Sequence, residues 1–189
     1  MQKIFLFILL AIFIWSCSGQ NNNAPEEYVK EINHWHKERV ERLKKDDGWL
    51  NLVGLHWLEE GRNTFGSDES NDIVFPSKAP EFIGTFYLND STVSVNIYDG
   101  VKVVAEGAEM DSMRIKTDMS GDPTLMENGS LNWHIIKRGE KYGIRLRDLE
   151  AEFVKNFEGI DRFPIDTIWR VRAEYVPYNP PKTIKIPTI

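Results

Sequence analysis

Histidine, tryptophan and arginine side chains recur in the parts of this sequence where polar and apolar residues alternate. His56 and Trp57 lie in the stretch WLNLVGLHWLEE, Arg145 and Arg147 in YGIRLRD, and Arg170 in TIWRVRAEYV. Guanidinium groups and aromatic rings together suit ligands that have both a polar group and an apolar face. We therefore expect these residues to line a ligand-binding cleft.

The sequence offers little for covalent or acid–base catalysis. It contains no Gly-x-Ser-x-Gly turn, no Ser-x-x-Lys pair and no glycine-rich phosphate loop, so neither a nucleophile nor a cofactor is predicted. His56 and His134 each lack a neighbour in sequence that would orient or activate the imidazole. Acid pairs drawn from Asp111, Asp118 and Asp122 stay open, so no catalytic residue is assigned and enzyme activity is undecided.

Histidine and cysteine usage gives no metal site either. His34 and His36 fall two residues apart on an expected helix, where side chains point about 200° apart and cannot hold one ion together. Cys17 is the only cysteine, which rules out a disulfide and a cysteine-rich metal centre. No bound metal is predicted.

The loop that contains Asp68, Ser70 and Asp72 has the spacing of the first three ligands of a calcium loop. However, Ile73 stands where that loop needs glycine, and Ala79 stands where it needs a bidentate acid. Aspartate and asparagine side chains also bond nearby backbone amides in ordinary turns. We expect such a turn here.

The same stretch, FGSDESNDIVFP, is similar to the opening strand and loop of forkhead-associated domains, which bind phosphothreonine. Those domains carry an arginine beside the glycine and a Ser-x-x-His a few residues later, which supply contacts to phosphate. Here Phe65 and Ser67 flank Gly66, and SKAPEFIG holds no such pair. The resemblance therefore implies a shared β-sandwich loop without the phosphopeptide site.

The N-terminus has the pattern of a secretion signal. Lys3 precedes the apolar run Ile4–Trp15, which is shorter than the roughly 20 residues that span a bilayer. Ser16 and Cys17 follow, and this arrangement resembles the bacterial lipobox, in which the cysteine is acylated. Residues 1–16 are thus predicted to be a lipoprotein signal peptide; the alternative is an ordinary cleaved signal with an incidental cysteine.

The predicted lipid anchor indicates where the protein is found. Residues 17–24 are polar and read as a flexible tether. Ser18 stands where aspartate retains many lipoproteins at the inner membrane, so by resemblance we expect the periplasmic face of the outer membrane. The net charge of −6 argues against nucleic acid as a partner, because phosphate binding needs a basic surface.

Residue periodicity predicts one helix followed by many short strands. Apolar residues recur at helical spacing over Pro25–Lys45, and this face is expected to lie on the sheet that follows. Later alternation indicates two strands joined at 59–61, a hairpin around Gly139 and a strand in TIWRVRAEYV. We expect a mainly β fold, a sandwich or barrel-like set of antiparallel sheets with one N-terminal amphipathic helix, as one domain over 25–189.

Three stretches, DGWLNLVGLHWLEEGRNTFGSDESNDIVFP, IIKRGEKYGIRLRD and FEGIDRFPIDTIWRVRAEYVPY, resemble the bacterial family named domain of unknown function 1684 (DUF1684). The resemblance runs from about Tyr28 to the end and is most specific over Trp49–Pro76. It implies a β-rich protein and supplies no mechanism. Members of that family continue further, into a segment that looks most like a site, so we expect this chain to match the N-terminal part of the family's usual length.

These patterns favour an envelope lipoprotein that acts as a periplasmic binding or interaction module. Its partners would be the membrane, through Cys17, and an unknown small molecule or envelope protein. The alternative is a hydrolase whose remaining catalytic groups lie in a C-terminal half beyond this sequence. A third interpretation, a structural envelope protein, would show neither a cleft nor a ligand.

Overall fold

The computed structural model describes residues 24–185. The predicted signal peptide, Cys17 and most of the tether therefore lie outside the described residues. Two compact units can be distinguished, one made by the chain's two ends, up to Lys37 and from Asp161 onward, and one made by Glu38–Ile160. Each is described by itself.

The elements are mostly short strands. In chain order they are α2 (Glu26–Lys44), β1 (Leu52–Trp57), β2 (Gly61–Gly66), β3 (Ile73–Val74), β4 (Gly84–Asn89), β5 (Thr92–Ile97), β6 (Val104–Ala105), β7 (Ala108–Glu109), β8 (Ser112–Arg114), the 3-10 turn η1 (Asp118–Ser120), β9 (Met126–Asn128), β10 (Leu131–Arg138), β11 (Lys141–Asp148), α3 (Glu152–Lys155) and the 3-10 turn η2 (Thr167–Trp169). The expected mainly β fold with a helix near the N-terminus is confirmed.

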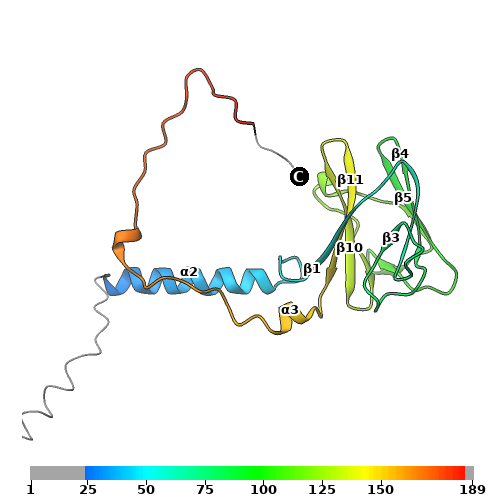
Figure 1. Ribbon diagram of the computed structural model, residues 1–189, viewed down its shortest axis with the longest axis horizontal. Coiled ribbons are helices and arrows are strands. Elements are labelled where there is room, and N and C mark those ends of the chain that lie inside the picture. The colour runs from blue at the N-terminus through cyan, green and yellow to red at the C-terminus, as the bar shows by residue number, and fades with distance from the viewer. Residues whose placement is uncertain (1–23, 186–189) are drawn as a thin grey trace, which may run out of the picture. The chain divides into compact units, whose positions relative to one another are not determined.

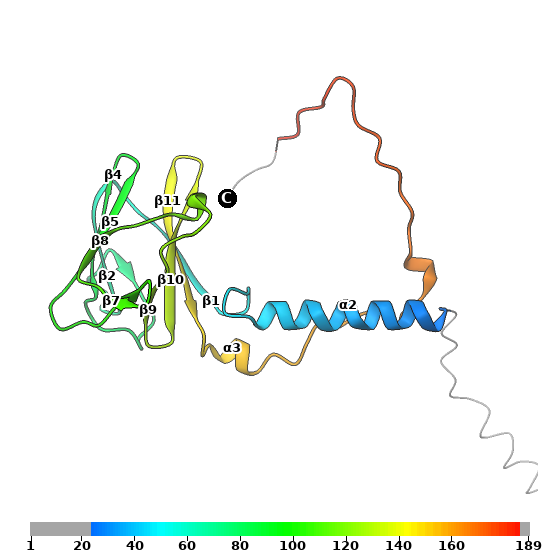
Figure 2. The ribbon, with the colours of Figure 1, turned by 180° about the vertical axis from the view of Figure 1, so that it is seen from behind.

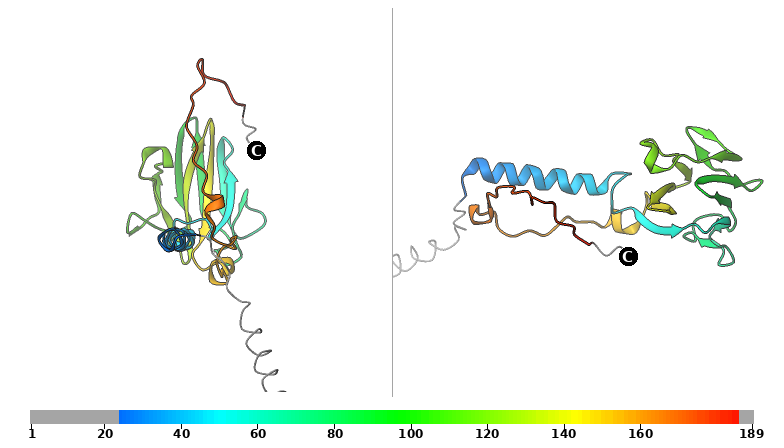
Figure 3. Two further views of the ribbon diagram at one scale, coloured as in Figure 1. Left: turned by 90° about the vertical axis from the view of Figure 1, so that its left-hand side faces the viewer. Right: turned by 90° about the horizontal axis from the view of Figure 1, so that it is seen from above.

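The strands form two sheets that face one another (Figures 1 and 2). A six-stranded sheet has the order β1-β11-β10-β9-β6-β7, and a five-stranded sheet has the order β3-β2-β4-β5-β8. All pairings are antiparallel except the short parallel pair β2–β3. The two layers are also distinct when the molecule is turned (Figure 3).

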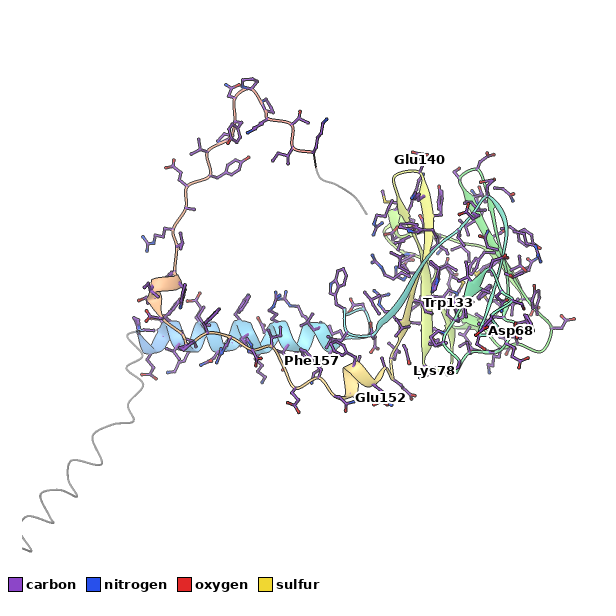
Figure 4. The ribbon with its side chains drawn as sticks, in the orientation of Figure 1. Asp68, Lys78, Trp133, Glu140, Glu152 and Phe157 are labelled. Atoms are coloured by element: carbon purple, nitrogen blue, oxygen red, sulfur yellow. The ribbon has the colours of Figure 1, made fainter. Side chains whose placement is uncertain are left out.

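The β10–β11 hairpin is the longest paired unit of the fold. Its register pairs Leu131 with Asp148 at one end and Arg138 with Lys141 at the other. Gly139 has φ +59°, a conformation that the tight turn requires and glycine adopts without strain. Glu140 marks the tip (Figure 4). The hairpin predicted around Gly139 is confirmed.

The hydrophobic core lies between the sheets and is rich in aromatic rings. Trp133 of β10 is fully buried and meets Phe65 and Phe75 edge-on, with ring centroids 6.0 and 5.3 Å away. Phe65 also packs on Phe86, at 4.5 Å. Figure 4 shows Trp133 between the two layers. Such aromatic contacts stabilise the fold in addition to the free energy gained by burying apolar surface.

Two predicted strands, β1 and β2, exist but do not form a hairpin. β1 pairs with β11 in one sheet, whereas β2 pairs with β4 in the other. The connection is held by the buried amide of Asn63, whose Oδ1 accepts from Glu59 N and whose Nδ2 donates to Glu59 O. Residues 59–61 therefore carry the chain between layers, which short-range turn signals cannot distinguish from a hairpin.

One further expectation is confirmed and another differs from the structure. α2 has the predicted bounds within one residue, and none of its residues is buried. The stretch TIWRVRAEYV contains η2 and no strand. An alternating sequence becomes a strand only when a neighbouring backbone accepts its hydrogen bonds, and no described segment does so here.

Within residues 24–185, no helix is both long enough and apolar enough to cross a membrane.

Candidate functional site

Three neighbouring strands, β1, β11 and β10, bring the arginines and tryptophan together on one face. Side chains alternate between the two faces of a strand. On β11, Tyr142, Ile144 and Leu146 enter the core, so Arg145 and Arg147 lie on the opposite, outer face. Trp57 lies on this face too. A Cβ placed on Gly143 would point to the outer face, and the atom nearest to it would belong to the Trp57 ring.

The other two predicted cleft residues are His56 and Arg170. His56 is adjacent to Trp57 on β1 and therefore points to the inner face, where its ring centroid is 6.3 Å from that of the core residue Phe75. Burial lowers its pKa. Arg170 belongs to the unit made by the chain ends, where its guanidinium lies 5.3 Å from the Tyr28 ring centroid. His56 therefore faces away from Arg145, on the opposite side of the sheet.

His134, and not His56, is the histidine that lies beside the arginines. It is buried on β10 directly opposite Arg145, and its Nδ1 lies 3.3 Å from Nη1 of Arg147. Burial and then the charges of Arg147 and Arg145 lower its pKa to about 4. It is therefore neutral at pH 7, so its Nδ1 can accept from the guanidinium. The signal for this residue was in the sequence, because a tight turn around Gly139 pairs position 134 with 145.

Arg147 is nearly buried on this face, and the charge of Asp47 acts against the lowering of its pKa. Only 8% of it is exposed, its Nη2 donates to the carbonyl of Asp47 at 3.3 Å, and its buried Nε has no hydrogen-bond partner. Within the described residues, neither Arg147 nor Arg145 forms an ion pair. Burial, followed by repulsion from Arg145, lowers the pKa of Arg147.

A hollow lies where the chain leaves α2. Its volume is about 470 Å³, and Asp47, the acceptor of Arg147 Nη2, is one of its lining residues. The other lining residues are mainly basic or aromatic and include Arg39, Arg42, Lys45 and Trp49. Positive side chains at the C-terminal end of a helix complement its dipole, which is their structural role.

An apolar strip borders the arginines on β1. Val53, Leu55 and Trp57 are 41, 51 and 37% exposed, which is high for large apolar side chains on a strand. Lys141 places its Nζ 5.7 Å from the Trp57 ring centroid. The outer face therefore presents apolar surface beside positive charge, and we call the set Trp57, Leu55, Arg145, Arg147 and His134 the outer-face site.

The carboxylates of the same unit are used within the fold. Asp118 accepts from the backbone N–H of Lys137 and from Arg138 Nη1, at 2.9 and 2.6 Å. Burial acts to raise its pKa, but these bonds outweigh that effect and the pKa is lowered. No hydrogen bond joins Asp118 to His134. Asp118 therefore lacks the geometry of an acid–base partner for the histidine.

A Ser–Lys–Asp cluster at the end of the β10–β11 hairpin resembles a catalytic grouping in composition only. Asp148 accepts from Ser130 Oγ and is paired with Lys78 Nζ, both at 2.7 Å. The Ser130 hydroxyl donates to Asp148 and accepts from Lys78 Nζ at 3.2 Å, so the lysine is not placed to take its proton. Figure 4 shows Lys78 at the end of the hairpin opposite Glu140. The cluster joins the hairpin to the loop between β3 and β4, which contains Lys78.

The loop with calcium-like spacing is a bonded turn, as expected. Asp68 Oδ1 accepts from the N–H and the hydroxyl of Ser70. Asp72 Oδ2 accepts from the N–H and the hydroxyl of Thr64, both at 2.7 Å. These bonds lower the pKa of both aspartates. Residues 24–185 contain no group of three or more His, Cys, Asp or Glu side chains placed to hold a metal ion.

Comparison with known proteins gives likeness at the level of solved structures only. No model of a known protein family matches the chain, and no curated protein does. Solved structures similar to this chain include the FHA domain of FhaA in complex with an intracellular domain (TM-score 0.34, 12% identity, covering 49% of this chain and 97% of that one).

Two others are the FHA domain of the CT664 protein from Chlamydia trachomatis (TM-score 0.35, 15% identity, 50% of this chain and 94% of that one) and Mycobacterium tuberculosis EmbR in complex with a low-affinity phosphopeptide (TM-score 0.34, 10% identity, 65% of this chain and 31% of that one). At these values the likeness does not bear on binding or activity. The DUF1684 assignment stays a prediction.

Proposed function

We propose that this protein is an envelope lipoprotein that acts as a binding module and holds an anionic, partly apolar ligand at the outer-face site. The observation that carries the proposal is a pair of arginines, Arg145 and Arg147, that lie together and form no ion pair with any residue of 24–185. A buried guanidinium costs several kcal/mol in lost hydration unless something compensates it. An anionic ligand supplies that compensation.

The surroundings of the arginines support a ligand with two kinds of surface. Neutral His134 helps to fix the Arg147 guanidinium, and Trp57 and Leu55 offer apolar surface beside Arg145. Pockets that bind selectively combine a few placed polar groups with apolar walls. The ligand class that fits is a carboxylate or phosphate compound that has an apolar part.

The hydrolase alternative gains no support from the two histidines of the sheets. It requires a histidine and a carboxylate to converge in a cleft. Instead, His56 lies against Phe75, and His134 lies against Arg147. The binding module is therefore the better account of the groups in residues 24–185.

A charge-reversal experiment tests the binding function. Fluorescein-labelled polyglutamate is titrated into the full chain, purified in non-ionic detergent, and followed by fluorescence anisotropy, with polylysine as the reference probe. Because the protein carries a net charge of −6, nonspecific attraction would favour polylysine. The proposal predicts that polyglutamate binds and that Arg145→Glu weakens it by about tenfold or more.

A matched variant controls for the change in net charge. Arg114→Glu makes the same substitution on exposed β8 of the other sheet, where the arginine donates to Thr92 Oγ1. It should leave the affinity within about twofold. Polyglutamate binding that is absent, or that falls equally in both variants, would overturn the outer-face site.

The anchor belongs to the proposal and has its own test. If Cys17 carries lipid, the wild type incorporates radiolabelled palmitate in a bacterial host and fractionates with the outer membrane. Cys17→Ser should lose the label, and Ser16→Ala, which keeps a small residue before the cysteine, should retain it. Equal labelling of wild type and Cys17→Ser would contradict lipid attachment at this residue.

A further inference from the structure

The two sheets have four outer edges, and one of them differs from the rest. The edges are β7 and β3, of two residues each, β8, of three residues, and β1, of six. Proteins keep edge strands from pairing with other chains by making them short, charged or bulged. β7 ends in Glu109 and β8 in Arg114, whereas β1 reads LVGLHW and carries neither a charge nor a proline.

The backbone of β1 has hydrogen-bonding groups that face away from its neighbour. Leu58 N donates to Tyr142 O, so this position is a hydrogen-bonded pair with β11. Such pairs alternate with non-bonded ones along antiparallel strands. The pairs Trp57–Gly143 and Leu55–Arg145 are therefore non-bonded, and the N–H and C=O of Leu55 and Trp57 point to the open edge.

The bulge on β1 does not close this edge. The register shifts between Leu52 and Gly54, at the start of the strand. From Gly54 to Trp57 the pairing with β11 is regular. Burial lowers the pKa of His56, so the imidazole inside the fold adds no charge to the strand at pH 7. A regular segment without acidic, lysine or arginine side chains is left, and no residue of 24–185 is bonded to the outward N–H and C=O of Leu55 and Trp57.

Positive charge flanks the open edge on the outer face. Arg145 lies directly across from Leu55, and Lys141 lies over Trp57. The same two residues of β1 therefore offer backbone groups at the edge, apolar side chains on the face, and cations one strand away. An extended chain whose side chains alternate acidic and apolar matches this order, because residues i and i+2 share a face.

We infer that an acidic, extended polypeptide adds as a new strand to the open edge of β1, with its carboxylates directed to Arg145 and Lys141. This inference rests on the proposed function and gives its ligand class. In strand addition, main-chain hydrogen bonds supply affinity and alternate side chains supply specificity. The bonds would form with the N–H and C=O of Leu55 and Trp57.

Two substitutions of Leu55 separate the contribution of the backbone to binding from that of the side chain. Leu55→Pro removes the outward N–H while leaving the hydrogen bonds to β11 in place, and proline is tolerated on an edge strand for that reason. Leu55→Ala removes the side chain and keeps the N–H. The full chain is titrated with fluorescein-labelled Val-Glu-Val-Glu-Val-Glu and followed by anisotropy.

Strand addition predicts that Leu55→Pro weakens the peptide by about tenfold or more, while Leu55→Ala weakens it by about threefold or less. Circular dichroism and thermal melting establish that the proline variant is folded. A second measurement leaves the protein untouched: the same peptide with alternate backbone nitrogens methylated should lose binding to the wild type. The counterpart with lysine in place of glutamate should not bind.

The outcomes separate this inference from the function on which it rests. If Arg145→Glu abolishes peptide binding while Leu55→Pro and methylation leave it unchanged, the site binds anions and strand addition is wrong. If no acidic probe binds, both strand addition and the proposed binding function are wrong. Binding to vesicles of anionic phospholipid with no binding of the peptide would also overturn the inference, in favour of a membrane surface.

Discussion

At the scale of single residues, Arg147 contacts His134 and helps to lower the pKa of its imidazole. Its guanidinium is nearly buried, meets His134 at 3.3 Å and stands opposite Asn132, whose buried Oδ1 is also without a hydrogen-bond partner. Burial and two arginines keep the histidine neutral. Burial is the larger cause, and the charge that Arg147 brings to the outer face lowers the pKa of His134 further.

Replacing Arg147 should move the titration of His134. In Arg147→Met the side chain keeps much of its length and loses its charge, so the pKa of His134 rises from about 4 toward its ordinary value of 6.5, although burial keeps it below that value. An NMR titration of the imidazole measures the shift. Arg114→Met is the control and should leave it unchanged; an unshifted pKa in Arg147→Met would mean that burial alone sets it.

The lowered pKa of His134 also links stability to pH. The unfolded chain takes up a proton near pH 6.5, whereas the folded chain does so only near pH 4. The unfolded state therefore binds more protons in this range, and the free energy of unfolding falls as the pH drops from 6.5 to 4. His134→Gln should flatten this part of the stability curve, measured by urea unfolding; an unchanged slope would contradict a neutral buried histidine.

At the scale of elements, the end of the β10–β11 hairpin depends on one carboxylate. Burial tends to raise the pKa of Asp148, but hydrogen bonds from Lys78, Ser130 and the Glu150 N–H outweigh it, so the pKa is lowered. The stability this carboxylate contributes is present above its unfolded pKa near 3.8 and is lost as the pH falls through the folded value.

Removing that carboxylate should weaken the hairpin measurably. Asp148→Ala leaves its donors without an acceptor, and we expect a loss of about 2 to 4 kcal/mol in the free energy of unfolding. Glu150→Ala keeps the N–H that donates to Asp148 and removes only an exposed side chain, so it should cost less than about 0.5 kcal/mol. Equal effects in chemical denaturation would contradict a specific role for Asp148.

Local patterns predicted the elements better than they predicted the sheets. Alternation and glycine turns were enough for the β10–β11 hairpin, because strand and partner are adjacent in sequence. They could not separate β1 from β2, which lie in different sheets, since that depends on the distant partners β11 and β4. The alternating TIWRVRAEYV was predicted as a strand for the same reason: its pattern is local, and its partner would not be.

The structure brings Trp57, Arg145 and Arg147 to one face but turns His56 away from it, for a simple geometric reason. His56 and Trp57 are neighbours on one strand, so they cannot both face the same cleft. The register of the hairpin brings His134 to Arg145 instead, and that register follows from the turn. The open edge of β1 could not be predicted, because it depends on the strand order of the whole sheet.

At the scale of the whole molecule, the unit made by Glu38–Ile160 contains the entire buried hydrophobic cluster, from Leu58 to Leu146. A chain with its own core can fold by itself. Residues 38–160, expressed alone, should unfold cooperatively, with a melting temperature within about 5 °C of the main transition of the full chain. Non-cooperative melting by calorimetry would show that the chain ends are needed.

We propose that an anionic ligand is held on the outer face of β1, β11 and β10. The most direct measurement is an NMR titration of the full chain with polyglutamate that follows the Arg145 Nε–H, the Trp57 indole N–H and the Leu55 amide. We predict that these signals shift together with one affinity, while the Arg114 Nε–H on the other sheet does not move. Shifts confined to the five-stranded sheet, or no shifts at all, would contradict the claim.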